Sequence, residues 1–258
     1  MTSQPGIVRR LFWPTVSAVI AFVILVSLGT WQVHRLAWKE DLIAQIAARA
    51  TAPPVSLDTA IKRWHDGENI EYLRVAMTGR WLNDREQFVW AVGPQGGGWD
   101  VFTPLLTASG QYVIVNRGFV PEAYRDRTRR PEPGGPNAEV HVVGLVRHPE
   151  TPGLFTPDND TMRNRWFWRD LDGMKKTMQL GDHPVAPMFI DAERLPPAVA
   201  AANPGLPRGG ATHLTLPNSH LQYAVTWYGL ALTLIGVYVA FVLSRLRQSG
   251  KPDDPDRK

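Results

Sequence analysis

The apolar residues of the chain gather in two long runs near its ends. No charged side chain occurs in residues 11–33 or in residues 223–243, which are 23 and 21 residues long. A helix of 23 residues measures roughly 34 Å at about 1.5 Å per residue, which is enough to cross a hydrocarbon core of about 30 Å. Both runs exceed the roughly 7–15 apolar residues of a signal peptide. The pattern therefore predicts two transmembrane helices, at 11–33 and 223–243.

Between the runs the pattern changes to short apolar–polar alternation, which is typical of half-buried strands. Strands are predicted at residues 72–82, 86–92, 100–107, 111–120, 139–147, 165–170 and 185–192. The first helix is predicted to continue beyond the membrane as far as Pro53 and Pro54, because proline stops a helix. Two short helices are also predicted, one capped by Ser56 and one at residues 171–180.

These elements define the expected fold class, an α+β membrane protein. Two transmembrane helices flank a mainly antiparallel β domain with short helices, and this domain comprises residues 34–222. Six or seven short strands with hairpin spacing favour a small barrel or a curved sheet.

The net charge of +4 resides in the two tails. Residues 1–10 and 244–258 each carry a net charge of +2, so residues 11–243 are neutral. A nucleic-acid partner is not expected, because a phosphate-binding groove needs basic residues clustered in the folded domain.

Basic residues beside apolar spans favour the cytoplasm. The expected location is a bacterial inner membrane with both tails cytoplasmic and residues 34–222 periplasmic, since the short N-terminal tail has no room for a transit peptide.

The sequence offers little for catalysis. It has no cysteine, which removes thiolate nucleophiles, thiolate metal sites and disulfides. It has no nucleophile elbow and no HExxH motif, and the glycine-rich residues 93–98 lack the GK[ST] of a phosphate loop and are interpreted as a hairpin tip. The chain is therefore not expected to be an enzyme, and a membrane-anchored periplasmic enzyme is the weakest hypothesis.

Two of the seven histidines, His34 and His220, stand at the outer ends of the predicted spans. A neutral imidazole nitrogen there can ligate a haem iron, and the alternative is that both histidines are polar anchors at headgroup level. Trp227 follows His220 by two helical turns, so its ring either flanks a planar ligand or belongs to the aromatic belt. A stripe of small residues is interpreted as the contact with the first span. The stripe consists of Thr226, Gly229, Thr233, Gly236 and Ala240.

The residues at both span ends resemble signatures of the SURF1 family of cytochrome oxidase assembly factors. The first signature is residues 28–36, LGTWQVHRL, followed by Trp38 and Lys39, and the second is residues 218–231, NSHLQYAVTWYGLA. Shorter matches follow one another between them, at residues 72–75 with Gly79, 103–105, 115–121, 144–152 and 164–166. The likeness covers nearly the whole chain and includes the two-span topology.

The resemblance implies a role in the maturation of haem–copper terminal oxidases, with delivery of haem a to subunit I. Some bacterial members are held to bind haem through a histidine and a tryptophan of the second span, which correspond here to His220 and Trp227. His220 is thus the expected ligand of the haem iron, and His34 is a further candidate that rests on its position alone. The implied partners are oxidase subunit I, haem a synthase and the lipid bilayer. The main alternative is a protein-only scaffold that holds nascent subunit I open without carrying haem.

Overall fold

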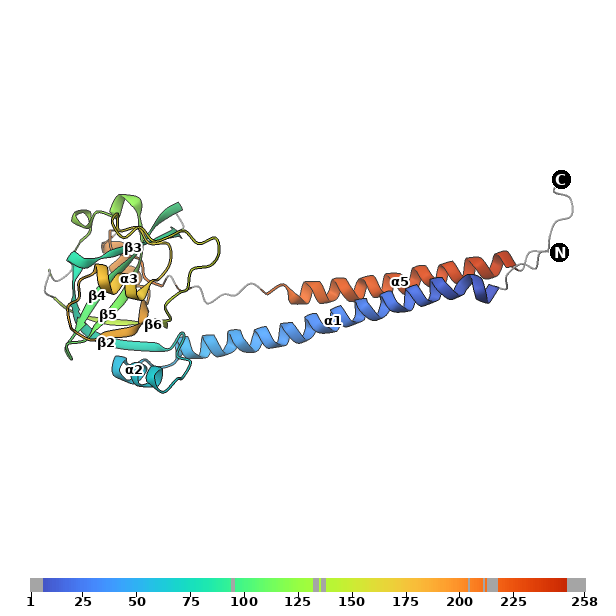
Figure 1. Cartoon of the computed structure of the whole chain (residues 1–258), viewed down its shortest axis with the longest axis horizontal. Coiled ribbons are helices and arrows are strands. Elements are labelled where there is room, and N and C mark those ends of the chain that lie inside the picture. The colour runs from blue at the N-terminus through green and yellow to red at the C-terminus, as the bar shows by residue number, and fades with distance from the viewer. Residues whose placement is uncertain are drawn as a thin grey trace. The chain divides into compact units, whose positions relative to one another are not determined.

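The computed structural model describes residues 7–93, 96–131, 135, 138–203, 205–210, 212 and 218–249 of the chain (Figure 1). The chain divides into two compact units. The helical unit comprises residues 1–44 and 215–258, and the sheet unit comprises residues 45–214.

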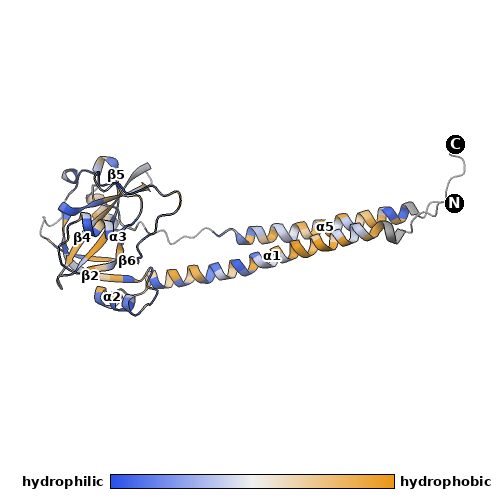
Figure 2. Ribbon diagram, in the orientation of Figure 1, coloured by the Kyte–Doolittle hydropathy of each residue, from blue (hydrophilic) through white to orange (hydrophobic). Residues whose placement is uncertain are grey.

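The helical unit is built from α1 (Ile7–Thr51) and α5 (His220–Ser249). Both helices are long and apolar enough to cross a membrane, as their colouring in Figure 2 shows. Helix α1 runs past the end of its apolar segment without a break and ends at Thr51, just before Pro53 and Pro54. The predicted continuation of the first helix is therefore confirmed.

Helices α1 and α5 contact each other through a few close side-chain pairs. A Cβ atom added at Gly29 would lie 2.9 Å from the Tyr228 ring, so this position of α1 has no room for a larger residue. The Thr30 hydroxyl lies 3.1 Å from the Tyr228 hydroxyl, and the hydroxyl of Thr15 bonds that of Tyr238. Glycine at position 29 therefore leaves space for the Tyr228 ring against α1.

The predicted small-residue contact on α5 is wrong. A Cβ atom added at Gly229 or Gly236 would meet no atom within 4 Å, and Thr226, Thr233 and Ala240 are exposed. The shielded face of α5 lies to one side of that stripe. It carries Ala224, Trp227, Ala231, Leu234 and Tyr238. The spacing of small residues predicts the helical period correctly but not the face, because almost every position of this helix is apolar.

The sheet unit contains seven strands in one sheet. Their order in the chain is β1 (Val55–Ser56), β2 (Arg74–Trp81), β3 (Gln87–Gly93), β4 (Gly96–Thr107), β5 (Tyr112–Pro121), β6 (Glu139–Arg147) and β7 (Val185–Ala192). Their order in the sheet is β1-β2-β6-β7-β5-β4-β3, and a further pairing of β2 with β4 closes five of them into a ring. The sheet is therefore a small closed barrel, β2-β6-β7-β5-β4.

Most strand pairs of the barrel are antiparallel, and β5–β7 is the parallel exception within the ring. The fold class predicted from the sequence, two apolar helices flanking a mainly antiparallel sheet domain with short helices, is confirmed. Strands β6 and β7 have the predicted bounds.

Alternation along the strands separates two large apolar cores, and a smaller cluster of Trp99, Val101 and Val120 lies apart from them. On β5, Val113 and Val115 join one cluster that draws residues from all five strands of the ring, whereas Tyr112 and Ile114 join a second cluster. The second cluster contains the fully buried Trp166 and is covered by helix α3 (Leu171–Thr177). Each face of the barrel wall thus has its own core.

The remaining helices are short. Helix α2 (Leu57–His65) begins as predicted, with the Ser56 hydroxyl accepting a hydrogen bond from the Thr59 N–H at 3.2 Å. Helix α3 ends at Thr177, three residues earlier than predicted. Four further short helical segments had no prediction. They are α4 (Pro197–Ala202), η1 (Asn83–Arg85), η2 (Glu122–Tyr124) and η3 (Arg127–Arg129).

One prediction for the sheet unit is wrong, and a second is confirmed only in part. Residues 165–170 do not form a strand of the sheet, since only isolated bridges Asp160–Arg165 and Val89–Trp166 occur there. The interpretation of residues 93–98 as a hairpin tip holds only in part, because Gly93 pairs with Gly96 and β4 begins at Gly96. Glycine is needed in this strand because a Cβ at Gly98 would lie 2.5 Å from the Val120 carbonyl oxygen.

Candidate functional site

His220 is the first residue of α5 and contacts α1. Its Nδ1 atom lies 2.7 Å from Oε1 of Gln32, and the ring is half-buried. An amide oxygen only accepts hydrogen bonds, so the tautomer of His220 that makes this bond carries its proton on Nδ1 and donates to Gln32. In the neutral form of this tautomer the lone pair is on Nε2, and that is the form in which a histidine ligates a metal.

Trp227 lies two turns beyond His220 on the shielded face of α5. Its ring is half-buried, and the neighbours on this face, Ala224 and Ala231, are 2% and 3% exposed. Ala224 lies between the two larger side chains, and Ala231 lies one turn beyond Trp227, so small residues flank the indole on both sides along this face. The face therefore carries an imidazole at its start and an indole two turns later, with buried alanines beside the indole.

His34 lies on a different face of α1 from the one that contacts His220. It follows Gln32 by two residues, which is a rotation of about 200° around the helix, and its side chain is exposed. The residue that meets His220 is Gln32. His34 as a haem ligand stays a prediction. Next to it, the guanidinium of Arg35 stacks on the Trp38 ring at 3.9 Å from the ring centre.

Gln32 is the functional candidate that sequence reasoning missed. A single amide at the end of an uncharged run belongs to no recognisable chemical motif. The available signal was its position, because a polar side chain near the end of a span is expected to have a polar partner, and His220 stands at the matching end of the other span.

The residues fit haem better than they fit a bare metal ion. No group of three or more His, Asp or Glu side chains able to hold a metal ion occurs in the described part of the chain. A haem iron needs fewer protein ligands, since the porphyrin supplies four, and one neutral imidazole beside apolar surface meets that need. His220 would provide the ligand, and Trp227 would offer an aromatic contact to the macrocycle.

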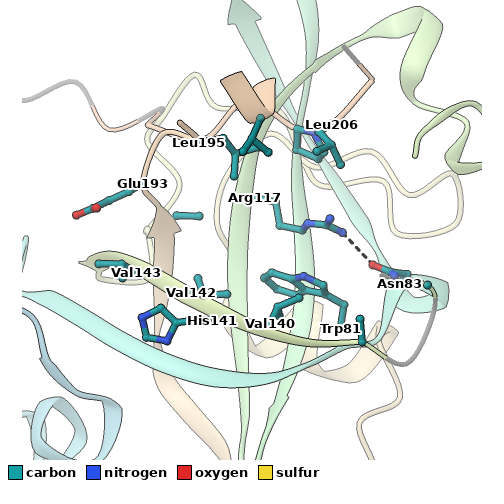
Figure 3. Close-up of a pocket in the computed structure, with 15 residues that line it drawn as sticks. Trp81, Asn83, Arg117, Val140, His141, Val142, Val143, Glu193, Leu195 and Leu206 are labelled. Atoms are coloured by element: carbon teal, nitrogen blue, oxygen red, sulfur yellow. Dashed lines mark hydrogen bonds between the residues drawn. The ribbon is translucent and has the colours of Figure 1, made fainter. Parts of the chain in front are cut away.

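A separate pocket lies in the sheet unit (Figure 3). It has a volume of about 280 Å³, and its apolar wall includes Val140, Val142 and Leu206. Figure 3 shows Arg117 pointing toward Asn83 beside the Trp81 ring. The guanidinium of Arg117 donates to Asn83 Oδ1 at 2.9 Å and lies 4.7 Å from the Trp81 ring centre. This cation is also paired with a carboxylate of the fold, so it helps to hold the barrel together.

The structure thus defines a membrane protein in which a small closed barrel is carried between two apolar helices, with a histidine held by an amide between those helices. The family model described as SURF1 family matches residues 19–232. The chain therefore belongs to the SURF1 family.

Individual relatives agree with this assignment. The chain is 34% identical over 265 residues to a SURF1-like protein of Monosiga brevicollis, covering 96% of this chain and 94% of that one. It is 35% identical to Surfeit locus protein 1 of Takifugu rubripes, over 86% of this chain and 93% of that one. It is 37% identical to Surfeit locus protein 1 of Homo sapiens, over 80% of this chain and 69% of that one.

Proposed function

We propose that this chain is an assembly factor for a haem–copper terminal oxidase, and that it binds haem, as haem a, at His220. The observation that carries the proposal is the hydrogen bond between His220 Nδ1 and Gln32, because Nε2 of the neutral ring would then be the nitrogen that ligates iron. Trp227, on the same helix face, would lie against the macrocycle. Membership of the SURF1 family supports the role in assembly.

Haem is cargo in this proposal, and the chain performs no catalytic step. A carrier must bind its cargo and also release it. His220 supplies one ligand from the chain, and a single protein ligand permits transfer by exchange with a histidine of oxidase subunit I. Gln32 fixes the orientation and the tautomer of His220, so the ligand is ready before haem arrives.

The proposed partners are oxidase subunit I, which receives haem, and haem a synthase, which supplies it. The proposed location is a bacterial inner membrane with both termini cytoplasmic and the sheet unit periplasmic. The basic residues at the C-terminal end of α5, Arg245 and Arg247, support this orientation.

The test is an optical spectrum of the full chain, purified in detergent after co-expression with a haem a synthesis pathway. We expect a Soret band in the parent and its loss in His220→Ala. The matched control is His65→Ala, because His65 is an exposed histidine at the end of α2. Gln32→Leu should lower haem affinity by about 10–100-fold, the usual effect of removing a hydrogen-bond partner of a metal ligand.

Two results would contradict haem binding at this site. A Soret band that survives in His220→Ala would place the ligand elsewhere, and His34→Ala would be measured next. The absence of a band in the parent would favour the protein-only scaffold, in which the chain stabilises nascent subunit I without haem. Co-purification of subunit I with the parent chain would then distinguish the scaffold from an inactive preparation.

A further inference from the structure

The sheet unit carries an exposed apolar loop between β6 and α3. Three of its large apolar side chains, Leu154, Phe155 and Met162, are 92%, 93% and 97% exposed. Side chains of this size are normally buried on folding, and such exposure usually marks an interaction site. None of the three belongs to either core cluster of the barrel wall.

The loop is held in place by hydrogen bonds, so the exposure is not the result of a loose chain. Its two ends meet where the Glu150 N–H donates to the Arg169 carbonyl and the Arg169 N–H donates to the Glu150 carboxylate, both at 3.1 Å. A second pair of backbone bonds, 2.8 and 2.9 Å long, joins Asp160 and Arg165. The Asn159 side chain accepts from the Phe167 N–H at 2.7 Å.

The exposed side chains occupy the tips of two turns within this loop. Leu154 and Phe155 are the central residues of a turn in which the Thr156 N–H donates to the Gly153 carbonyl at 3.0 Å. Met162 is at the tip of the turn that the Asp160–Arg165 pair closes. Turn tips normally carry Gly, Pro, Asn, Asp or Ser, so large apolar residues at both tips need another explanation.

We propose that these two turns insert their apolar tips into the headgroup region of the bilayer that holds the helical unit. Residues 151–157 contain no charge, so the first turn can enter an apolar layer without dehydrating an ion. The second tip places Arg163 beside Met162. Its guanidinium pairs with Asp160 at 3.2 Å, and its side chain is still 76% exposed, so the remaining N–H groups can meet lipid phosphate.

The tethering of the sheet unit makes the bilayer the favoured occupant. Residues 45–214 lie between two helices able to cross a membrane, so a lipid surface is always present at high effective concentration. Even weak insertion of three side chains is then sufficient to hold the loop at the surface. This proposal is independent of haem binding.

The test uses the full chain in liposomes with single labelling sites, which is possible because the natural sequence has no cysteine. An environment-sensitive fluorophore is attached to Leu154→Cys or to Met162→Cys. The matched control is Ala108→Cys, at the exposed tip of the turn between β4 and β5. We expect blue-shifted emission at positions 154 and 162 but not at 108.

Lipids that carry a nitroxide report the depth of each label. Interfacial side chains lie about 5–10 Å into the headgroup and acyl boundary, so a nitroxide near the headgroup should quench positions 154 and 162 more than one near the acyl terminus. Adding Phe155→Ser to the labelled Leu154→Cys variant should reduce quenching at position 154. The midpoint of thermal unfolding should stay unchanged, because Phe155 is exposed and belongs to neither core cluster. Quenching at 154 and 162 no greater than at 108 would overturn the proposal and indicate a protein partner for the loop instead.

Discussion

Glu86 is the carboxylate on which two arginines of the sheet unit converge. Arg130 bonds both of its oxygens, and Arg117 approaches Oε1 at 3.3 Å. Glu86 and Arg130 are both buried, so the pair is screened little by water. Such a pair is a weak source of net stability while intact, but its disruption leaves an uncompensated buried charge.

Glu86→Gln should therefore destabilise the sheet unit by about 3–5 kcal/mol, because the buried Arg130 guanidinium loses the carboxylate that it pairs with. The measurement is the thermal unfolding of the full chain in detergent, followed by near-ultraviolet circular dichroism. Glu68→Gln is the control, since Glu68 is exposed and the same substitution there should change the midpoint little. Equal midpoints for the two variants would contradict this account.

Asp126 allows a prediction about pH. Its carboxylate accepts hydrogen bonds from the hydroxyl and the N–H of Thr128, at 2.8 and 2.9 Å. These bonds, the hydroxyl bond first, hold the pKa of Asp126 below its ordinary value. Because the folded pKa is lower than the unfolded one, the stabilising contribution is complete well above pH 4 and is lost as the pH falls through the folded pKa, with about 3.9 as the ordinary value.

Thr128→Val removes the hydroxyl but keeps the N–H, so it should raise the pKa of Asp126 toward the ordinary value. Thr128→Ser keeps both donors and should leave the pKa depressed. The carboxyl chemical shift of Asp126, followed by NMR from pH 2 to pH 6, reads the pKa directly. An identical titration in the two variants would show that the hydroxyl is not the cause.

Two residues of the candidate site, His220 and Trp227, could be predicted from the sequence, whereas their neighbour Gln32 could not. His220 is recognisable because a titratable ring at a span end is unusual, and the spacing to Trp227 follows from helical periodicity alone. Both residues lie on one face of α5, as that spacing requires. Their partner Gln32 is 188 residues away in the chain, so only the packing of α1 against α5 brings it to His220.

At the scale of the element, the α1–α5 contact depends on Gly29. A leucine there would meet the Tyr228 ring, because even a Cβ would lie 2.9 Å from it. Gly29→Leu should push the helices apart and reduce, several-fold, the yield of a short thiol crosslink between Gln32→Cys and His220→Cys. The crosslink is measured in the full chain by gel mobility after cleavage between the two cysteines.

Gly229→Leu is the matched control for this experiment. Gly229 has the same residue type in an apolar helix, but a Cβ there has no atom within 4 Å. The crosslink yield should therefore stay at the parental level. A drop as large as that of Gly29→Leu would mean that the stripe inferred from the sequence does form the helix contact.

Strands were predicted correctly where successive residues point alternately into two different apolar cores. Strand β7 contributes Met188 and Ile190 to one cluster and Phe189 to the other, so its pattern is unambiguous. Residues 165–170 also alternate, yet only Trp166 is fully buried there, and it enters the second core from a loop. A single buried tryptophan in a loop looks the same in the sequence as an inward-facing residue of a strand. The local pattern of apolar and polar residues therefore cannot distinguish the loop from a strand.

At the scale of the whole molecule, barrel closure could not be read from the sequence. It depends on Gly79, Arg80 and Trp81 of β2 pairing with residues 105–107 of β4. A Cβ at Gly79 would lie 2.4 Å from the Leu106 carbonyl oxygen, so glycine permits the two strands to meet. A lone glycine in an alternating segment indicates a close approach but does not name the partner strand.

The orientation of the whole chain in its membrane gives the last prediction. If the basic tails are cytoplasmic, a membrane-impermeant maleimide should label Ala108→Cys, in the sheet unit, in intact spheroplasts, and should leave Lys251→Cys, beyond the end of α5, unlabelled. Detergent permeabilisation should make both thiols react equally, which controls for accessibility of the tail. Labelling of Lys251→Cys before permeabilisation would reverse the orientation. It would also place His220, at the start of α5, at the cytoplasmic end of its helix, and haem would then have to be supplied from that side.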